Sequence, residues 1–423
     1  MKILTIVFVF FAIFVNQLDA QWTTLSTVST NYPSNFIVNN NGDLYVTTND
    51  GVYKSIDDGM SWSEITNSFI NDPSNANRYI EFAGNNIYVA TTTNGVYMSP
   101  DNGGTWQFDT TGLGPFNFGP EIDLLYSDGN NIFASYVGFS ANGFFRKTSG
   151  TGPWTKVVSG TLGNDYGSEV LGLTRIGTEL FAATPSLGVF VSSDDGVSWT
   201  QKSNNNFPAN ATIFPFNSNR LISKENNLYY KSHDGLFMST DFGNNWSRID
   251  QGFAASSIQC IYTDGANIYA SLWGNDNAYY STDDGTTWQD ISAGLPQWVV
   301  SFVMKGGTLF ATTFGDSEVI INNGISDVEL INSEVPAKFV LENNFPNPFN
   351  PSTKIKFSIP YASNVTLEVF NSIGESLGLL VSQELPSGIY NYQWDATSLT
   401  SGVYFYRLRA GSFVETKKMI LMK

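Results

Sequence analysis

Short apolar runs, in which aromatic and small side chains alternate after a turn, recur along most of the chain. The seven runs are Leu44-Tyr45-Val46, Ile87-Tyr88-Val89, Ile132-Phe133-Ala134, Leu180-Phe181-Ala182, Leu228-Tyr229-Tyr230, Ile268-Tyr269-Ala270 and Leu309-Phe310-Ala311. Runs of this length and composition, bounded by turn residues, predict β-strands. No stretch after the first twenty residues has a sustained helical period, so the pattern predicts an all-β protein.

A polar phrase, Ser-x-Asp-x-Gly-x-x-Trp, separates these runs. Its five copies are Ser55–Trp62, Ser99–Trp106, Ser192–Trp199, Ser239–Trp246 and Ser281–Trp288. A sixth copy, which ends at Trp154, keeps the tryptophan and little else. Successive tryptophans from Trp62 to Trp288 are 42 to 48 residues apart. A period in the forties is typical of a four-stranded antiparallel unit, one blade of a β-propeller.

The apolar run occurs seven times and the phrase six times, including the degenerate copy. Since each blade needs one apolar run, the sequence predicts seven blades. In the first blade the expected strands are 35–40, 44–48, 51–55 and 61–66. The seventh unit lacks a fourth strand with a tryptophan, but residues 21–24 near the start of the chain, which include Trp22, resemble one. An N-terminal strand that completes the last blade closes the ring and removes exposed sheet edges. The sequence therefore predicts a seven-bladed propeller over residues 21–325.

The first twenty residues form a separate segment. Lys2 precedes an apolar run from Ile3 to Val15, and the small residue Ala20 follows. This is the pattern of a secretory signal peptide, with cleavage expected after Ala20. The run is too short to cross a bilayer as a stable anchor, and no later segment is long and apolar enough for a membrane span.

Composition and charge exclude some functions. Charged residues make up 14% of the chain and aromatic residues 15%, with 38 glycines, which suits turn-rich β structure. Residues 21–333 contain 12 basic and 30 acidic side chains. Such an acidic surface argues against nucleic acid and against anionic lipid as partners, because both require clustered Lys and Arg. The single histidine, His233, makes a metal site or a histidine-based catalytic triad improbable.

The repeated phrase has a structural interpretation. Its Asp can accept hydrogen bonds from turn N–H groups, its Gly allows a positive φ, and its Trp can fill the space between blades. The phrase resembles the Asp-box, or BNR, repeat of sialidases and related propellers, which implies a turn remote from the substrate pocket. The residues given this structural role are Asp57, Gly59, Trp62, Asp101, Gly103, Trp106, Asp194, Gly196, Trp199, Asp241, Gly243, Trp246, Asp283, Gly285 and Trp288. A calcium loop is the alternative, but no copy has the bidentate Glu downstream.

Sialidase activity is not expected, because the Phe/Tyr-Arg-Ile-Pro signature of that family is missing and the propeller has few arginines. Hydrolysis of glycosides by another route needs only two suitably placed carboxylates. Propeller ligands usually bind on the face formed by the loops between second and third strands and the loops between blades. Here these loops carry Glu121, Asp123, Asp165, Glu169, Asp234, Asp276 and Asp316. A glycoside hydrolase that acts on extracellular polysaccharide therefore stays open as the alternative function.

Aromatic residues on the same loops favour binding without catalysis. Flat rings beside Asn, Asp and Gly suit stacking on sugars or anchoring of a protein partner. The candidate ligand-binding residues are Tyr136, Phe139, Tyr166, Trp273 and Trp298. The preferred function is that of a non-catalytic module for a polysaccharide or a surface protein, with no catalytic residue, metal or cofactor predicted. A passive surface component without a defined ligand is a third possibility.

The tail contains the second distinctive signal. Phe345–Thr353 reads Phe-Pro-Asn-Pro-Phe-Asn-Pro-Ser-Thr, and alternating strands are expected over 354–359, 365–370, 389–394 and 403–408. The expected fold is thus an all-β chain: a seven-bladed propeller, a linker over 326–336, and a small immunoglobulin-like β-sandwich over 337–423.

The tail is similar to the C-terminal sorting domain of the bacterial type IX secretion system. The residues that carry this resemblance are Pro346, Asn347, Pro348, Phe349, Asn350, Pro351, Gly402 and Tyr404. It implies that the type IX machinery is a partner, and that the protein is exported across the outer membrane and then released or attached to the surface with the tail removed. An ordinary immunoglobulin-like domain is the alternative.

Overall fold

The structure is a computed structural model of the chain. It describes residues 22–29, 32–39, 41–66, 77–92, 94–113, 122–136, 143–148, 152–157, 162, 169–208, 219–232, 234–251, 253, 257–274, 276–305, 307–315, 317–322, 328–332, 336–361, 363–374, 376–385, 387–396, 399–411 and 413–423. Within these residues the regular structure consists of strands, and none forms a helix long and apolar enough to cross a membrane.

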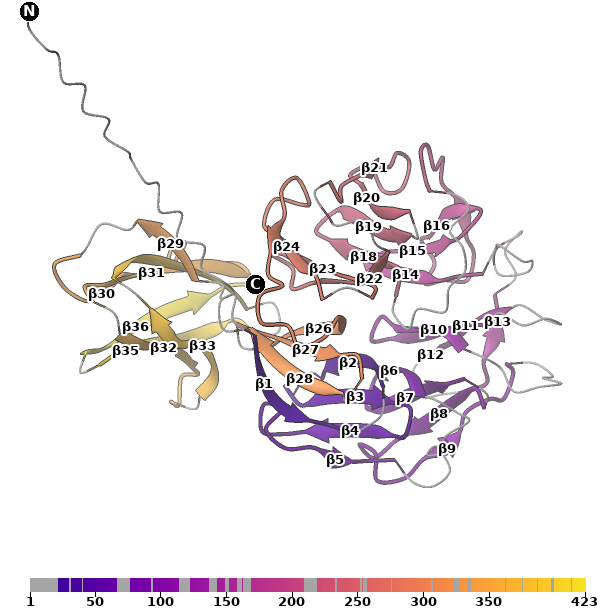
Figure 1. Cartoon of the computed structure of the whole chain (residues 1–423), viewed down its shortest axis with the longest axis horizontal. Helices are drawn as coiled ribbons and strands as arrows, with labels where there is room; N and C mark the ends of the chain where they lie inside the picture. Colours follow the sequence, from indigo (N-terminus) through magenta and orange to yellow (C-terminus); the bar gives the residue numbers. More distant parts are fainter. Residues whose placement is uncertain are drawn as a thin grey trace, which may run out of the picture.

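Strands β1 to β28 form a ring of four-stranded antiparallel sheets (Figure 1). The described strands of the ring give seven sheets: β2(Pro33–Val38) β3(Leu44–Thr48) β4(Val52–Ser55) β5(Ser63–Glu64); β6(Asn77–Ala83) β7(Asn86–Thr91) β8(Val96–Ser99) β9(Gln107–Phe108); β10(Ile122–Ser127) β11(Asn131–Tyr136) β12(Gly143–Thr148) β13(Thr155–Lys156); β14(Gly172–Ile176) β15(Glu179–Thr184) β16(Gly188–Ser192) β17(Thr200–Gln201); β18(Leu221–Lys224) β19(Asn227–Ser232) β20(Gly235–Ser239) β21(Ser247–Arg248); β22(Ile258–Thr263) β23(Ile268–Leu272) β24(Ala278–Ser281) β25(Gln289–Asp290); and β26(Val299–Lys305) β27(Thr308–Thr313) β28(Glu318–Asn322) with β1(Trp22–Thr27). This arrangement is a β-propeller.

The last sheet is completed by the N-terminal strand. β1 pairs antiparallel with β28, so that Trp22 faces Asn322 across the sheet. β26 of this sheet also contacts β2 of the first one. The strand expected at residues 21–24 therefore closes the ring where the tryptophan pattern placed it.

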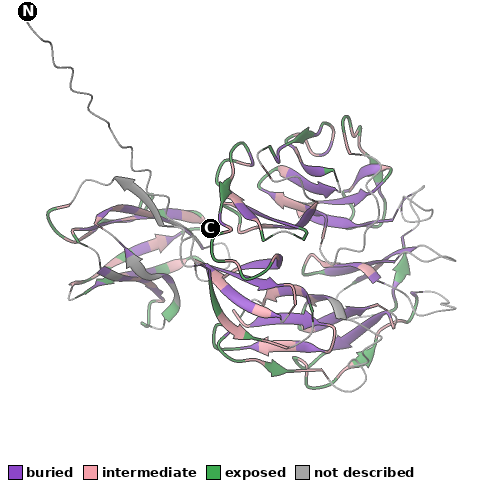
Figure 2. Cartoon of the chain, viewed as in Figure 1, coloured by how far each residue is buried: buried purple, intermediate pink, exposed green. Residues whose placement is uncertain are grey.

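Apolar side chains join each sheet to its neighbours. Leu124 of β10, for example, lies in one buried cluster with Leu173 of β14, and Tyr79 of β6 lies in another with Ile122 of β10. The fourth strand of each sheet from β5 to β25 is exposed and short (green at the rim in Figure 2). The ring is thus held by cores between sheets, and its outer strands contribute mainly through the turns that precede them.

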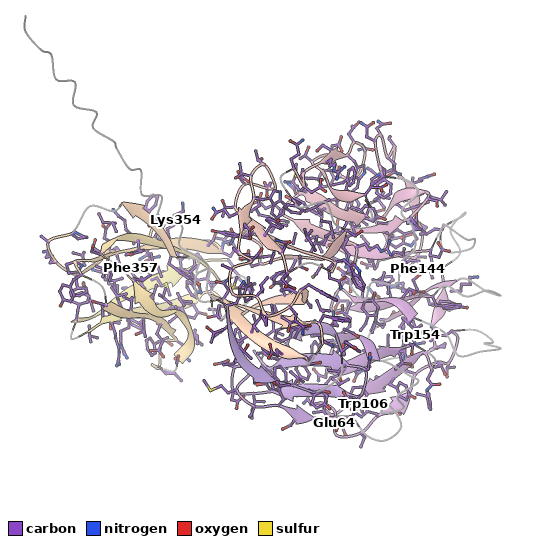
Figure 3. All side chains as sticks on the ribbon, viewed as in Figure 1. Glu64, Trp106, Phe144, Trp154, Lys354 and Phe357 are labelled. Atoms are coloured by element: carbon purple, nitrogen blue, oxygen red, sulfur yellow. The ribbon has the colours of Figure 1, made fainter. Side chains whose placement is uncertain are left out.

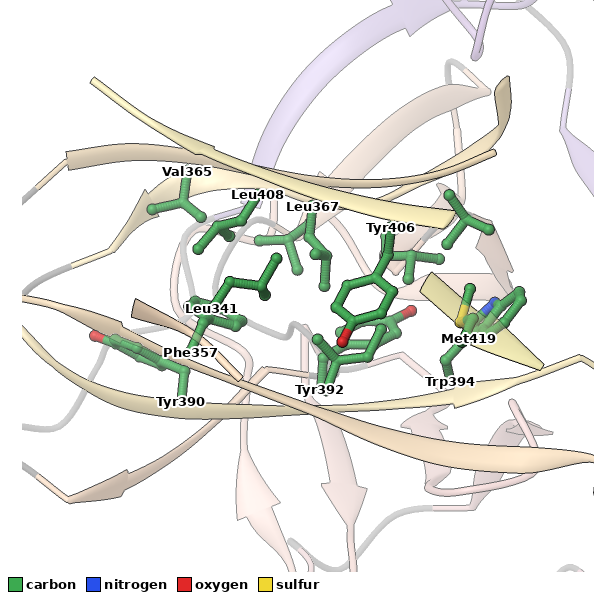
Figure 4. Close-up of a cluster of buried hydrophobic side chains, with 14 of the residues drawn as sticks. Leu341, Phe357, Val365, Leu367, Tyr390, Tyr392, Trp394, Tyr406, Leu408 and Met419 are labelled. Atoms are coloured by element: carbon green, nitrogen blue, oxygen red, sulfur yellow. The ribbon is translucent and has the colours of Figure 1, made fainter. Parts of the chain in front are cut away.

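Two further four-stranded antiparallel sheets form the tail, which is drawn in yellow and light orange at one side of the ring in Figure 1. Their strands are β29(Val328–Asn332), β34(Gly388–Asp395), β31(Ser352–Ile359) and β30(Val340–Leu341) in one sheet, and β33(Ser376–Leu385), β32(Ser363–Phe370), β35(Gly402–Ala410) and β36(Phe413–Leu421) in the other. One buried cluster fills the space between them, and Figure 4 shows the ring of Tyr406 reaching across it.

β29 lies inside the segment 326–336 that the sequence suggested as a linker. It pairs with β34 over Val328↔Tyr392 to Asn332↔Ile389 and so forms the edge of the first tail sheet. The chain thus has only a few residues between the last strand of the ring, which ends at Asn322, and the first strand of the tail.

We expect a fragment 328–423 to be more stable than a fragment 343–423. The shorter fragment lacks β29, which covers the edge of β34, and β30, whose Leu341 is buried in the tail core. Burial of one leucine side chain contributes about 2 kcal/mol, so the urea midpoint of the shorter fragment should be clearly lower. Equal midpoints would show that the sorting unit does not need the residues before 343.

Candidate functional site

Each copy of the repeated phrase forms the same hydrogen-bonded turn between the third and fourth strands of its sheet. In the copy at Ser192, the serine Oγ donates to Asp194 Oδ1 at 2.8 Å and accepts from the backbone N–H of Gly196 at 2.8 Å. Asp194 Oδ1 also accepts from the N–H of Ser198 at 2.9 Å, and Oδ2 accepts from the Ser198 hydroxyl at 2.6 Å. The turn saturates the carboxylate with donors from its own chain.

The partner of the second carboxylate oxygen was not recognised in the sequence pattern. The residue before each tryptophan donates a side-chain hydrogen bond to Oδ2 of the box aspartate; these residues are Ser61, Thr105, Ser198, Asn245 and Thr287. The phrase is therefore Ser-x-Asp-x-Gly-x-[Ser/Thr/Asn]-Trp. The signal was present, since this position is hydroxyl- or amide-bearing in all five copies.

Two successive residues of each box have positive φ, which explains the glycine. Asp195 has φ 56° and Gly196 has φ 82°. A Cβ on Gly196 would lie 2.5 Å from Cε1 of Phe133 in the neighbouring sheet. The glycine is thus required both by the backbone conformation and by close packing on the next blade.

The box tryptophans link neighbouring sheets through Nε1. Trp106 donates to Ile65 O and Trp154 to Asp109 O, both at 2.7 Å (both tryptophans are labelled in Figure 3). Trp288 donates to Ile249 O at 2.7 Å, and Trp22 donates to Ile291 O at 2.6 Å. In each case the acceptor comes three residues after the tryptophan of the preceding sheet.

Trp22 therefore occupies the tryptophan position of the last sheet. The other three box tryptophans use different acceptors. Trp62 donates to Ser26 Oγ on β1 of the last sheet, and Trp199 and Trp246 donate to the glycine carbonyls of their own boxes. The boxes therefore help to connect neighbouring sheets of the ring. Among the described residues, no group of three or more His, Cys, Asp or Glu side chains could hold a metal ion.

Hydrogen bonding lowers the pKa of the box aspartates. The Ser61 hydroxyl, the Ser61 N–H and the Ser55 hydroxyl lower the pKa of Asp57 to about 2, and the corresponding donors, Ser198 first, lower the pKa of Asp194 to about 2. The pKa values of Asp101, Asp241 and Asp283 are lowered too.

We expect the stability of the ring to fall between about pH 4 and pH 2. A carboxyl group whose pKa is lower in the folded state stabilises the fold when ionised, and this stabilisation is lost as the pH falls from the unfolded value near 4 through the folded value near 2. Melting temperatures between pH 6 and pH 2 measure the effect, and Asp194→Asn should flatten the profile. A profile that stays level below pH 4 would contradict this role of the boxes.

Aromatic rings form a row on the opposite edge of the ring from the boxes. We call this edge the loop face. It is the edge at which the first strand of each sheet begins and the second strand of that sheet ends. Trp273 lies 5.9 Å from Trp298, Trp298 stacks on Phe314 at 4.3 Å, and Phe314 stacks on Tyr32 at 4.6 Å between ring centroids. We call these four residues the aromatic ladder. It crosses three neighbouring sheets of the ring.

The ladder is built from two repeated positions. Tyr32 and Trp298 immediately precede the first strands β2 and β26, whereas Trp273 and Phe314 immediately follow the second strands β23 and β27. Backbone hydrogen bonds connect the two positions, as from Phe314 N to Trp298 O at 3.0 Å. Pairing within the last sheet thus holds Phe314 beside Trp298, whereas the contacts of Trp273 and Tyr32 with this pair join neighbouring sheets.

Of the five predicted ligand-binding residues, the structure brings together Trp273 and Trp298. Tyr136 does not fit the prediction: it is 6% exposed, ends β11 and stacks on Phe145 at 5.5 Å in a core between sheets. Phe139 and Tyr166 lie outside the described residues. Tyr32 and Phe314 were missed, although each occupies the same repeat position as one of the predicted tryptophans.

The predicted carboxylates of the loop face differ in burial and belong to different sheets. Glu169 is buried, while Asp234 and Asp276 are exposed on loops of different sheets. Asp123 is half-buried, and its backbone carbonyl accepts from the Tyr79 hydroxyl. Glu121, Asp165 and Asp316 lie outside the described residues.

In the tail, the Asn-Pro-Phe segment is attached to the last strand, β36. Asn347 Oδ1 accepts from Ile420 N at 3.0 Å, and its Nδ2 donates to Lys418 O at 3.3 Å. Phe349 N donates to Ile420 O, and Phe349 O accepts from Met422 N, both at 2.9 Å. The beginning and the end of the tail motif therefore form one structural unit.

Side chains inside the tail fix the preceding turn. The carbonyl of Pro346 accepts from Asn344 Nδ2 at 3.1 Å and from the Thr353 hydroxyl at 2.8 Å. The Tyr406 hydroxyl accepts from Asn344 N and donates to Glu342 O, both at 2.8 Å. A fully buried tyrosine thus holds the chain where it enters the motif.

The remaining motif residues have distinct positions. Pro348 and Asn350 are exposed, and Pro351 O accepts from a backbone N–H at 3.0 Å. Gly402 starts β35, and Tyr404 is buried with its hydroxyl donating to Thr400 O at 2.7 Å.

Comparison with known protein families supports the resemblance of the tail to a sorting domain. Residues 343–422 match the family described as the secretion system C-terminal sorting domain. Among curated proteins, none matches the sequence.

Solved structures resemble the ring. YCF48 from Cyanidioschyzon merolae is 15% identical with a TM-score of 0.51, covering 72% of this chain and 98% of that one. YCF48 bound to D1 peptide is 14% identical with a TM-score of 0.52, covering 71% and 96%. The extracellular domain of the two-component system protein BT4673 from B. thetaiotaomicron is 11% identical with a TM-score of 0.56, and the match covers 96% of this chain and 59% of that one.

At these identities the likeness concerns the fold alone. It agrees with the ring of four-stranded sheets, and the family match identifies the tail. The protein is a β-propeller protein that carries a type IX sorting domain and is exported to the cell surface or secreted.

Proposed function

We propose that the protein is a non-catalytic binding module, in which a seven-bladed Asp-box propeller presents the aromatic ladder to a glycan or a protein outside the cell. We also propose that residues 1–20 are a signal peptide, and that the tail is an immunoglobulin-like sandwich which serves export. The observation that carries the binding function is the ladder itself. Its end members Trp273 and Tyr32 are 45% and 48% exposed, although both are large aromatic residues.

What distinguishes the ladder from other exposed aromatic residues is that its four rings contact one another in a row across neighbouring sheets. Ring contacts between the four members restrict their rotation, so that little side-chain entropy is lost when a ligand binds. Aromatic residues of this kind dominate the binding energy of many interfaces. YCF48 has been solved with a bound peptide, so a propeller of similar fold can hold a protein segment.

Hydrolysis by a carboxylate pair has less support. Glu169 is buried, and the exposed acids Asp234 and Asp276 come from the loops after β19 and β23 of different sheets. The ladder itself, Trp273, Trp298, Phe314 and Tyr32, contains no carboxyl group.

The test measures binding of residues 21–423 to immobilised polysaccharides and proteins from the cell surface. We expect Trp273→Ala and Tyr32→Ala each to weaken binding about 10- to 30-fold, which corresponds to roughly 1.4 to 2 kcal/mol per ring. The matched control is Phe108→Ala, which removes a 59%-exposed aromatic ring on the outer strand β9.

Unchanged binding in the double variant would show that the ladder is not the site. Release of reducing ends, measured in the same samples and lost in Asp276→Asn, would favour the hydrolase instead.

A further inference from the structure

One side of the second tail sheet faces away from the tail core. On β35 the side chains of Tyr404, Tyr406 and Leu408 are buried in that core, and Figure 4 shows the last two pointing into it. Successive side chains of a strand point to opposite sides of the sheet. The alternate residues of β35 therefore lie on the outer side: Val403, Phe405, Arg407 and Arg409.

β36 contributes the other half of this outer side. Its residues Met419 and Leu421 are buried in the tail core, so that their alternate neighbours point outward. Across the two strands the outward residues form the pairs Val403↔Ile420, Phe405↔Lys418, Arg407↔Thr416 and Arg409↔Val414. We call these residues the outer face. The Asn-Pro-Phe segment borders it, because Phe349 forms a parallel bridge with Leu421.

The outer face is more apolar than the solvent-facing side of most antiparallel sheets, which is usually polar. Val403 and Val414 are 39% and 56% exposed, and Phe405 and Ile420 are partly exposed. The first tail sheet follows the usual pattern, since the outward residues of β31 that lie between buried ones are Lys354 and Lys356. A group of exposed apolar side chains on one face indicates an interaction surface.

The outer face also carries an excess of positive charge. Its cations are Arg407, Arg409 and Lys418, and Glu368 of β32 lies opposite Arg407. Among the described residues, no salt bridge involves any of these three cations. Arg407 instead stacks on the ring of Phe370, 4.3 Å from its centroid. Potentials are complementary across specific interfaces, so a partner with carboxylates at its contact surface fits this face.

We propose that the outer face is the surface by which the secretion machinery recognises the tail, and that the component which binds it presents apolar side chains and carboxylates. The family match supplies the kind of partner, because the whole outer face lies within residues 343–422, which match a sorting domain of a secretion system. The inward residues of β35 and β36 build the fold, and their outward neighbours carry the recognition. This inference concerns export and does not depend on the ligand of the ladder.

The experiment expresses the full chain in its natural host and measures its distribution between periplasm, cell surface and medium. Arg409→Glu combined with Lys418→Glu should lower the amount outside the cell at least about tenfold, because like charges would then meet across the interface. Val403→Thr combined with Ile420→Thr keeps β-branched side chains in the strands and removes apolar contact surface. This variant should lower the amount outside the cell about threefold or more.

Matched controls separate recognition from folding. Lys354→Glu reverses an exposed cation on the first tail sheet, and Ile373→Ser removes a 76%-exposed apolar side chain from the turn after β32; both chains should be exported normally. The urea midpoints of all purified variants should equal that of the natural chain, because the replaced side chains lie on the surface. If charge reversal lowers the midpoint, Arg409→Gln combined with Lys418→Gln decides instead, and normal export of that chain would refute the inference.

Three outcomes would overturn the assignment of the outer face. The first is normal export of both the charge-reversal and the threonine variants. The second is an equal loss of export with Lys354→Glu, which would show that export responds to the overall charge of the tail. The third is normal export with loss of attachment to the cell surface, which would assign the face to surface polysaccharide. Trp273→Ala should be exported normally, so that a failure of the binding function and a failure of this inference appear in different assays.

Discussion

Replacing Trp22 by alanine should destabilise the ring by about 3 to 5 kcal/mol, the usual cost of truncating a buried aromatic residue. Trp22 is 7% exposed and packs in the cluster that contains Phe302 and Tyr269. The substitution leaves a cavity at the joint where the N-terminal strand completes the last sheet. It also removes the donor to Ile291 O. A loss of this size is a large share of the stability of an ordinary domain.

Urea denaturation of the purified protein, followed by tryptophan fluorescence, measures the effect. Trp22→Phe is the matched control: it keeps most of the ring volume and removes the hydrogen bond to Ile291, so it should cost about 1 to 2 kcal/mol. If Trp22→Ala unfolds at the same urea concentration as the natural chain, β1 does not hold the ring closed.

Removing residues 419–423 should abolish export. The truncation deletes Met419 and Leu421, both fully buried in the tail core. It also deletes the backbone groups of Ile420 that bind Asn347 and Phe349. Loss of two core side chains costs roughly 4 kcal/mol or more, which is comparable with the whole stability of a domain of this size.

Cell fractionation tests this prediction: the truncated protein should accumulate in the periplasm, while the natural chain reaches the surface or the medium. A chain that lacks only Lys423 is the control, because it keeps the buried residues and the Met422 N–Phe349 O bond. Normal export of the chain that ends at Lys418 would mean that the β36 end is not part of the sorting signal.

The repeat pattern allowed much of the ring to be predicted. The period of the tryptophans and the seven apolar runs identified the strands, and Trp22 was recognised as the missing member of the series. Its Nε1 bond to Ile291, three residues after the preceding box tryptophan, follows the same rule as Trp106 and Trp288. A repeated sequence predicts well because each copy must satisfy the same backbone turn and the same contact with its neighbour.

The site could be predicted only in part. A shift of one residue at the end of a strand decides whether an aromatic side chain is buried in a core or exposed on the loop face. Tyr136 is the last residue of β11 and points into a core, whereas Trp273 is the first residue after β23 and is exposed. Alternate residues of a strand face opposite sides, so an aromatic residue at a strand end is ambiguous from the sequence. The sequence around β29 predicts a linker rather than a strand, because its pairing partner, β34, lies far along the chain.

The pairing of Trp22 with Asn322 has a kinetic consequence. Every other sheet of the ring pairs strands that are near neighbours in sequence, whereas this one joins the two ends of the propeller. The entropy of closing so long a loop must be overcome before the contact stabilises anything, and folding slows as such distant contacts dominate. Ring closure should therefore be the late and slow step of folding.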